Sequence, residues 1–243
     1  MYRQRNQPGK SGFTLIEMLV VIAIIALLTS MIVPAVKSTL VSASKVTAIN
    51  SLRQLGATNM LYATNHQGWF VPIHEKNGTA SPTIWYQNED FRDQLGLDFP
   101  SFSGGAHYPD SFIPRQARYA RSQSVKGYAR IDNAFGMNET GIVALRNYQG
   151  IPWSEMEKFG THISEIARPS STIQFGESVS HSIQRSSADN YQGEVEHKAP
   201  NLKAVAYRHN GKAAVVFYDN HTDLLGPEIL GDNDTNAQFW LPR

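Results

Sequence analysis

The residues Gly12-Phe13-Thr14-Leu15-Ile16-Glu17 open an apolar run that continues to Val33 and decides the fold of this chain. Glu17 is the only charged residue among the 21 residues from Phe13 to Val33. At about 1.5 Å rise per residue, the run forms a helix roughly 31 Å long, which is enough to cross the hydrocarbon core of a bilayer. A carboxylate in such a run costs free energy in lipid, so Glu17 is a candidate functional residue.

The leader before this run is basic. Residues 1–12 carry Arg3, Arg5 and Lys10 and no acidic residue, so we expect this end in the cytoplasm and the C-terminal bulk across the membrane. An ordinary secretory signal peptide fits poorly, because the apolar run is too long and no clear Ala-x-Ala cleavage site follows it. A plain signal anchor fits the hydropathy, but it does not explain a glycine followed five residues later by a glutamate.

The segment from Lys10 to Glu17, with the apolar residues up to Ala26, resembles the class III signal of type IV prepilins and type II secretion pseudopilins. The resemblance implies that a prepilin peptidase cleaves after Gly12 on the cytoplasmic side and that the new terminal residue, Phe13, is N-methylated. Glu17 is then the fifth mature residue, and its carboxylate can meet the α-ammonium of Phe13 from its own or a neighbouring subunit. A buried charge pair of this kind serves register better than stability.

Pro34 is the next marked position. A proline inside a helix removes one backbone hydrogen bond and usually kinks the helix. The resemblance implies a bend or local melting here on assembly, while the same residue also fits the point at which the chain leaves the membrane.

The chain continues with a helical pattern as far as Asn65, in which Gly56 is the only glycine. Apolar residues recur near the helical period at Leu40, Val41, Val46, Ile49, Leu52, Leu55, Leu61 and Tyr62. We predict one long helix from Phe13 to roughly Asn65, ended by His66-Gln67-Gly68, whose second half packs on a soluble domain.

About 200 residues remain for that domain, which is enough for one hydrophobic core. We predict an α+β, pilin-like fold in which the long N-terminal helix, membrane-spanning in its first half, packs on a small antiparallel β-sheet head with irregular loops. The expected parts are a cleaved leader, a transmembrane and assembly helix, an amphipathic continuation of the helix, and a soluble periplasmic or extracellular head, over residues 1–12, 13–36, 37–66 and 67–243.

The head contains short expected elements between turn-rich segments. Residues 74–125 read as irregular structure with one helical turn near Glu89–Leu95. Strands are expected within 127–138 and over 172–177, and residues 180–201 read as a polar surface loop.

The clearest pattern in the head is a β-hairpin from His209 to Leu225, with an apolar run followed by an Asp-Asn turn. It resembles the His, nine residues, Asp-Gly motif of pilin-like proteins from planctomycete- and verrucomicrobia-type bacteria. His209 and Asp219 keep that spacing, and Asn220 replaces the glycine. Asparagine tolerates the left-handed region, so the turn is expected to form.

Two groups of residues suit a metal ion. His209, Asp219 and His221 carry ligands for divalent transition ions, with a purely structural hairpin as the alternative. Asp232 and Asp234 lie in a loop whose oxygen side chains suit Ca²⁺, which some pseudopilins hold in a C-terminal loop. The alternative for this loop is a solvated acidic turn.

Composition excludes several classes of function. The chain has no cysteine, and 22 lysines and arginines nearly balance 21 aspartates and glutamates, so disulfides, thiolate chemistry and nucleic-acid binding have no support. No nucleophile elbow, P-loop, dinucleotide-binding pattern or His-Glu-x-x-His motif occurs, so we do not expect an enzyme.

The resemblance implies a subunit of a type II secretion pseudopilus or a type IV pilus-like filament, and it does not choose between them. The implied partners are a prepilin peptidase, like or related subunits, and an inner-membrane assembly platform. The implied location is the inner membrane, as a single-pass protein, and then the filament.

A second hypothesis is a membrane-tethered binding protein whose aromatic-rich head captures a ligand such as a glycan. Its candidate surface comprises Trp69, Trp85, Tyr86, Trp153, Phe239 and Trp240. A protein found only in the membrane and never in filaments favours this alternative.

Overall fold

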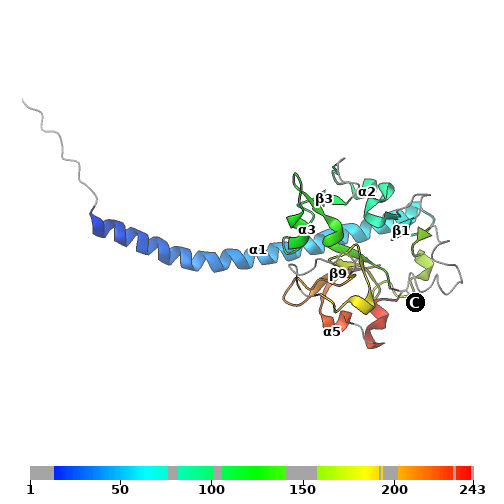
Figure 1. The fold of residues 1–243 in the computed structure, drawn as a ribbon. Helices are drawn as coiled ribbons and strands as arrows, with labels where there is room; N and C mark the ends of the chain where they lie inside the picture. The colour runs from blue at the N-terminus through cyan, green and yellow to red at the C-terminus, as the bar shows by residue number, and fades with distance from the viewer. Residues whose placement is uncertain are drawn as a thin grey trace, which may run out of the picture. The chain divides into compact units, whose positions relative to one another are not determined.

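The computed structural model describes residues 14–75, 82–100, 106–140, 158–191, 193, 202–231 and 234–241. Contacts within the chain divide it into two compact units, Met1–Ser42 and Ala43–Arg243. Figure 1 shows the path of the chain, with helix α1 shared between the two units. We call the second unit the head.

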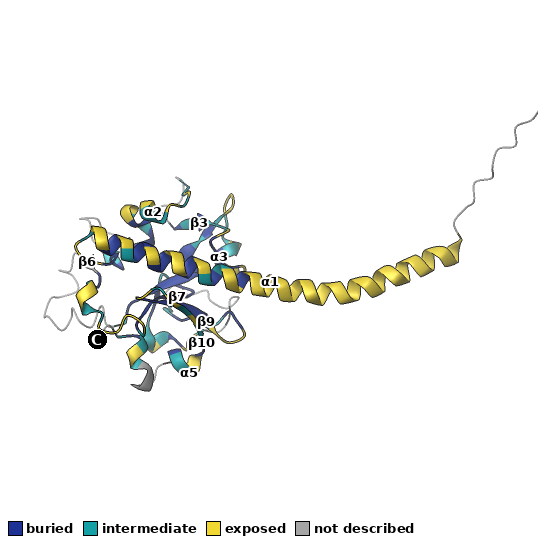
Figure 2. Cartoon of the chain, turned by 180° about the vertical axis from the view of Figure 1, so that it is seen from behind, coloured by how far each residue is buried: buried dark blue, intermediate teal, exposed yellow. Residues whose placement is uncertain are grey.

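Helix α1 covers Leu15–Asn65 and continues without interruption through Pro34. The predicted long helix is therefore confirmed, although Phe13 lies outside the described residues. Every residue from Thr14 to Ala43 is exposed, as Figure 2 shows in yellow. The predicted stop is also present, because Gln67 and Gly68 both adopt positive φ angles and Gly68 N donates to the Ala63 carbonyl at 2.8 Å.

The part of α1 within the head buries one face, and this face differs from the predicted apolar stripe. Leu52, Leu55 and Tyr62 are buried, but the other buried positions carry mainly small or polar side chains: Ser44, Ala48, Ser51, Gly56, Thr58, Asn59 and Ala63. Of the predicted stripe, Leu40, Val41, Val46 and Leu61 are exposed. Where a helix lies close to its sheet, the contact positions carry small side chains, so the periodicity of large apolar residues does not predict the buried face.

Gly56 marks the point of closest approach. A Cβ atom built at this position would lie 2.5 Å from Asn220 Oδ1 and 3.0 Å from Val216 Cγ2. Such distances are shorter than ordinary van der Waals contact, so a larger side chain would push α1 away from the hairpin. The only glycine of the helix therefore has a packing reason.

The main sheet has the strand order β10-β9-β7-β5-β8. Its strands are β5 (Phe135–Asn138), β7 (Ile173–Glu177), β8 (Ser182–Ile183), β9 (Ala213–Phe217) and β10 (Thr222–Leu225). Neighbours pair antiparallel except β5 and β8, which run parallel, so the expected antiparallel sheet is corrected at this edge. Two smaller antiparallel sheets join β1 (His74–Glu75), β2 (Thr83–Ile84) and β6 (Lys158–Phe159), and β3 (His107–Pro109) with β4 (Tyr128–Arg130).

Short helices connect these strands. The described helices are α2 (Glu89–Leu95), α3 (Arg118–Ser122) and α5 (Pro227–Leu230), with 3₁₀ turns at Trp85–Gln87, Ile131–Asn133, Ile163–Glu165, Arg185–Ser187 and Asp234–Phe239. The turn expected at Glu89–Leu95 forms as predicted, capped by the Asn88 side chain, which accepts a hydrogen bond from Phe91 N. The predicted surface loop over 180–201 is wrong in part, because Ser182 and Ile183 are buried in β8.

The hydrophobic core lies on both faces of the main sheet. Ala214 and Val216 of β9 join the larger cluster, which includes Leu52 and Leu55 of α1. Ala213, Val215 and Phe217 point to the opposite face and join Leu230 and Trp240. Because successive side chains of a strand alternate between faces, burial on both sides explains why β9 is an uninterrupted apolar run.

Candidate functional site

The start of α1 holds Glu17 in a defined geometry. Thr14 precedes the first helical residue, and its N–H and hydroxyl both donate to Glu17 Oε2 at 2.8 Å. In return, Glu17 N donates to Thr14 Oγ1 at 3.3 Å. This is a capping box, whose Thr-x-x-Glu signature is present in the sequence but was not part of the prediction. Glu17 therefore has a local partner, while Gly12 and Phe13 lie outside the described residues.

The surface of α1 around Glu17 is apolar, and no described residue of the chain covers it. Ile22 and Leu27, for example, are 63% and 60% exposed. Among the described residues, one helix, α1, is long and apolar enough to cross a membrane. Membrane anchoring is thus the role that suits the first half of α1.

Pro34 sits in a weakened stretch of the same helix. Proline has no N–H, so the Ser30 carbonyl cannot receive the usual i→i−4 hydrogen bond at this position. The hydroxyls of Thr29, Ser30 and Thr39 bond back to carbonyls one turn earlier, at 2.7–3.0 Å. Back-bonding of this type slightly destabilises helices and favours bending. The helix is unbroken here, but this stretch is the place where it bends most readily.

His209 lies in a buried group of charged residues within the head. Its Nε2 atom is 2.9 Å from Oε2 of Glu177, and both side chains are almost completely inaccessible. The same Oε2 accepts a hydrogen bond from Ala214 N at 2.9 Å. Glu177 ends β7 and Ala214 lies in β9, so the carboxylate joins the two central strands.

Arg208 completes this group. Its Nη1 atom lies 3.7 Å from Oε1 of Glu177, and neither side chain is exposed. The guanidinium donates to the carbonyls of Asn133, Ala134 and Ser178 at 2.8–3.0 Å. These contacts compensate the burial of the charge and fix the turn before β5 against the end of β7.

Asp219 and Asn220 form the turn at the other end of β9. Asn220 has a φ angle of 68°, and its N–H donates to the Phe217 carbonyl at 2.9 Å. Asp219 accepts from His221 N at 3.1 Å and contacts the His221 ring, which stacks on Phe217. Asparagine therefore supports the turn in place of glycine, as expected.

The structure does not bring the first group of candidate metal ligands together. His209 precedes β9 and Asp219 follows it, and a five-residue strand alone spans about 16 Å. Among the described residues, no group of three or more His, Asp or Glu side chains is arranged to hold a metal ion. The described residues therefore do not form a shared site of His209, Asp219 and His221.

The second metal candidate falls largely outside the described residues. Asp232 is not described, and nothing is described of the Asp234 side chain. The neighbouring Gly231 is described, and a Cβ atom built on it would lie 2.7 Å and 2.8 Å from the two carboxylate oxygens of Asp189. Asp189 therefore points at the first residue of the acidic loop.

Four of the five described aromatic residues of the second hypothesis lie in the core or pack against it. Trp85 and Trp240 are fully buried, and Tyr86 is 4% exposed. Phe239 packs against the cluster that contains Trp240. Trp69 is 43% exposed, and Trp153 lies outside the described residues. The described part of this aromatic set thus offers one exposed ring and no continuous ligand surface.

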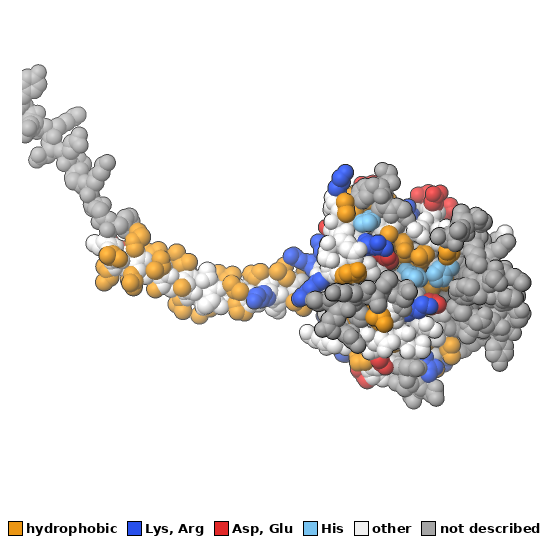
Figure 3. All heavy atoms as spheres, viewed as in Figure 1, with side chains coloured by type: hydrophobic (Ala, Val, Ile, Leu, Met, Phe, Trp, Pro, Cys, Tyr) orange, Lys and Arg blue, Asp and Glu red, His pale blue; other side chains and the backbone are white. Residues whose placement is uncertain are grey.

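A half-buried histidine pair lies elsewhere on the head. The rings of His74 and His181 meet edge to face, with centroids 5.2 Å apart. Trp85 Nε1 donates to the His181 carbonyl at 2.7 Å, and Lys203 pairs with Glu139 at 2.7 Å nearby. Burial, with a smaller contribution from the neighbouring His74, lowers the pKa of His181 to about 4. Burial also lowers the pKa of His74, an effect that Glu139 opposes. Figure 3 shows histidine and apolar side chains exposed together on one face of the head.

Comparisons with known proteins agree with the organisation of α1. A family model for the prokaryotic N-terminal methylation motif matches residues 8–33. Type II secretion system core protein G of Pseudomonas aeruginosa is 32% identical over 102 residues, which cover 39% of this chain and 70% of that protein. No solved structure matches the chain.

Proposed function

Because this chain belongs to the family of type II secretion system core protein G, we propose that it is a subunit of a type II secretion pseudopilus. The methylation motif and the similarity to core protein G together place the chain among the structural subunits of pseudopilus-like and type IV pilus-like filaments. Members of this family are structural subunits of filaments. We propose that this chain is likewise a filament subunit and has no enzymatic activity. We choose the pseudopilus over the pilus because the similar protein, core protein G, belongs to a type II secretion system.

Processing of the N-terminus is the first step of the proposal. A prepilin peptidase removes residues 1–12 by cleavage after Gly12, and the new terminal Phe13 is then N-methylated. The match of residues 8–33 to the methylation motif supports both reactions. Cleavage at this place leaves the whole apolar part of α1 on the mature protein.

The proposed location follows from charge and hydropathy. The basic leader stays in the cytoplasm, the first half of α1 spans the inner membrane once, and the head lies in the periplasm. The subunit then moves into the filament, where its apolar helix surface packs on like or related subunits instead of lipid. An inner-membrane assembly platform is the remaining partner, and no nucleic acid is involved.

Glu17 is the residue on which the proposed assembly depends. It is the only charge from Phe13 to Val33, and its partner in the structure is the exposed Thr14. Cleavage creates an α-ammonium group at Phe13 with which this carboxylate can pair inside the filament. Such a pair contributes little net stability, because desolvation offsets the attraction, but it sets the register between neighbouring helices.

Substitutions at both ends of the capping box separate capping from charge pairing. Glu17→Gln keeps an N3 side-chain oxygen for the capping box but removes the charge, so we expect normal membrane insertion and loss of filaments. Thr14→Ala removes the cap, weakens the helix end by about 1 kcal/mol and leaves filaments intact. Immunoblots and electron microscopy of sheared fractions measure assembly, and carbonate-resistant membranes measure insertion.

The opposite assembly behaviour of the two variants contradicts the proposed pairing of Glu17 with Phe13. If Glu17→Gln assembles like the wild type while Thr14→Ala does not, Glu17 acts as a helix cap and has no part in pairing with Phe13.

We further propose that the C-terminal acidic loop binds Ca²⁺ through Asp232 and Asp234, with Asp189 as an additional ligand. The Asp189 carboxylate beside Gly231 supports this, because Ca²⁺ prefers several carboxylate oxygens. Added Ca²⁺ then raises the melting temperature of the full chain in detergent, and Asp189→Asn reduces the rise. A melting temperature that is the same in Ca²⁺ and in EDTA contradicts the proposal.

A further inference from the structure

Basic residues gather where α1 enters the head. No acidic residue occurs between Ala35 and Asn65 of α1 or between Ser111 and Ile131 of the head. Lysine and arginine side chains lie along this part of the surface in Figure 3. We use the name basic collar for Lys45, Arg115 and Arg118, all of which are exposed.

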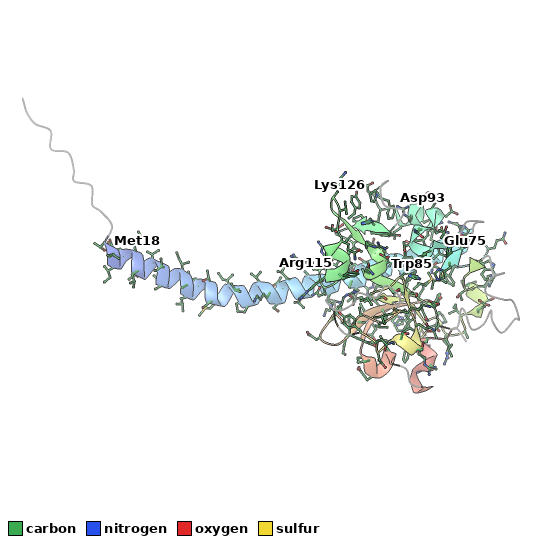
Figure 4. The ribbon with its side chains drawn as sticks, in the orientation of Figure 1. Met18, Glu75, Trp85, Asp93, Arg115 and Lys126 are labelled. Atoms are coloured by element: carbon green, nitrogen blue, oxygen red, sulfur yellow. The ribbon has the colours of Figure 1, made fainter. Side chains whose placement is uncertain are left out.

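Two hydrogen bonds bring the basic collar together. Gln116 N donates to Ser44 Oγ at 3.3 Å, and Ser51 Oγ donates to the Phe112 carbonyl at 2.6 Å. They hold the segment before α3 along about two turns of α1. Lys45 and Arg115 are each one residue away from a bonded partner, so their main chains lie near each other, and Figure 4 shows Arg115 beside α1.

The basic collar has no internal role that the structure reveals. Within the described residues, no carboxylate pairs with Lys45, Arg115 or Arg118. Arg121, one turn after Arg118, is different, because it lies 3.6 Å from Asp110 and donates to the carbonyls of Asp110 and Ile113. The fold therefore uses Arg121 and leaves the charges of the basic collar available to an outside partner.

We propose that the basic collar binds anionic phospholipid headgroups of the membrane that holds α1, and so keeps the head of the unassembled subunit on the membrane surface. The proposal rests on the membrane anchoring that is part of the proposed function. Each Lys or Arg in a cluster next to a membrane helix strengthens binding to an anionic lipid surface by about fivefold.

The position of the basic collar along the chain supports a lipid partner. Lys45 follows Val36 by nine positions, or about 14 Å of helix. The weakened stretch around Pro34 lets the helix bend and so bring the collar to the headgroups. Val46, next to Lys45, is 52% exposed, and a cation beside an exposed apolar side chain suits the interface between lipid and water.

A second copy of the chain is the rival partner. Glu89, Asp90 and Asp93 of α2 are exposed, and Asp90 lies 3.3 Å from His66, just after the end of α1. The collar of one subunit and α2 of the next then have opposite charges. Continuity with the membrane helix and the exposed Val46 favour lipid.

The experiment uses the full chain in phosphatidylcholine vesicles with and without phosphatidylglycerol. The protein has no cysteine, so a single cysteine introduced by Ser122→Cys, at the exposed end of α3, carries a fluorescent dye. A quencher attached to the lipid headgroups reports how often the head lies on the surface. We expect phosphatidylglycerol to increase quenching severalfold and high salt to reverse the increase.

Charge-reversal variants identify the residues. Lys45→Glu with Arg115→Glu and Arg118→Glu removes the increase, whereas Arg115→Lys with Arg118→Lys retains it. Lys212→Glu, at the exposed Asn210-Gly211 turn, is the matched control and leaves quenching unchanged. Circular dichroism and melting temperature confirm that each variant is folded.

Four results overturn the proposal. Equal quenching in both lipids, or quenching that the triple variant does not change, excludes a lipid partner. Loss of filaments in the triple variant with normal quenching assigns the collar to a neighbouring subunit instead. Extraction of the wild-type chain by carbonate shows that the anchor itself is wrong, which removes the premise together with the proposal.

Discussion

The two halves of α1 form one continuous helix but differ in what they bury. From Thr14 to Ala43 every residue is exposed, whereas from Ser44 onward one face of the same helix is buried in the head. Ile22 is 63% exposed, and Leu52 is fully buried. Figure 2 shows the change from yellow to blue along one continuous helix.

This difference separates folding from assembly. The second half of α1 buries one face within its own chain, including the large side chains of Leu52, Leu55 and Tyr62, and so contributes to the stability of the head. The described part of the chain buries no residue of the first half, so its apolar surface can pack on lipid or on another subunit. Changes in the head are therefore expected to alter stability, and changes in the first half are expected to alter assembly.

The largest expected effect is on the buried charges of the head. Glu177→Ala leaves Arg208 without its carboxylate in a buried position, so we expect a loss of about 3–5 kcal/mol in the free energy of unfolding. Urea denaturation of the full chain in detergent, followed by the fluorescence of the buried Trp85 and Trp240, measures this loss. Membrane insertion is expected to stay normal.

Glu89→Gln is the matched control, because Glu89 is an exposed acid of α2. Its effect on the same denaturation midpoint is expected to lie within about 0.5 kcal/mol. If Glu177→Ala proves as mild as Glu89→Gln, the buried group does not hold the two central strands together.

A smaller effect is expected from pH, again confined to the head. The pKa of His181 is about 4 in the folded state and 6.5 for an ordinary histidine, so the folded state binds this proton more weakly than the unfolded state. The contribution to stability is complete above pH 6.5 and is lost as the pH falls toward 4. The total change is on the order of 3 kcal/mol.

Melting temperatures across this pH range measure the effect. Other groups face the pair and also act on it, namely Glu139, Lys203 and Asp132. The double variant His74→Asn with His181→Asn therefore isolates the histidines and is expected to flatten the profile between pH 6.5 and 4. An unchanged slope in this variant assigns the pH dependence to the carboxylates instead.

Elements with a strong local pattern were predictable from sequence. The length of α1, its stop at Gly68, the turn of α2 and the hairpin of β9 and β10 follow from periodicity, glycine and asparagine positions. The buried face of α1 was not predictable from sequence, because Ser44, Ala48 and Gly56 are small or polar and give no hydrophobic signal. Strand β8 was missed because its Ser182 is polar and its pairing with β5 is not local.

The candidate site divides in the same way. Glu17 was identified because a lone carboxylate in an apolar run is a local signal, and Thr14 was overlooked although the capping box is also local. His209 was identified by its spacing to Asp219, but its partner is Glu177, 32 residues earlier in the chain. No sequence spacing indicates that pairing, because register between β7 and β9 creates it.

The most direct test of the account is the N-terminus of the chain in filaments. Filaments sheared from cells are purified, and mass spectrometry measures the first peptide of this subunit. We predict a chain that begins with N-methylated Phe13, with the whole apolar half of α1 present. A chain absent from filaments, retaining residues 1–12, or cleaved after Val33 contradicts the claim that this surface is an assembly interface.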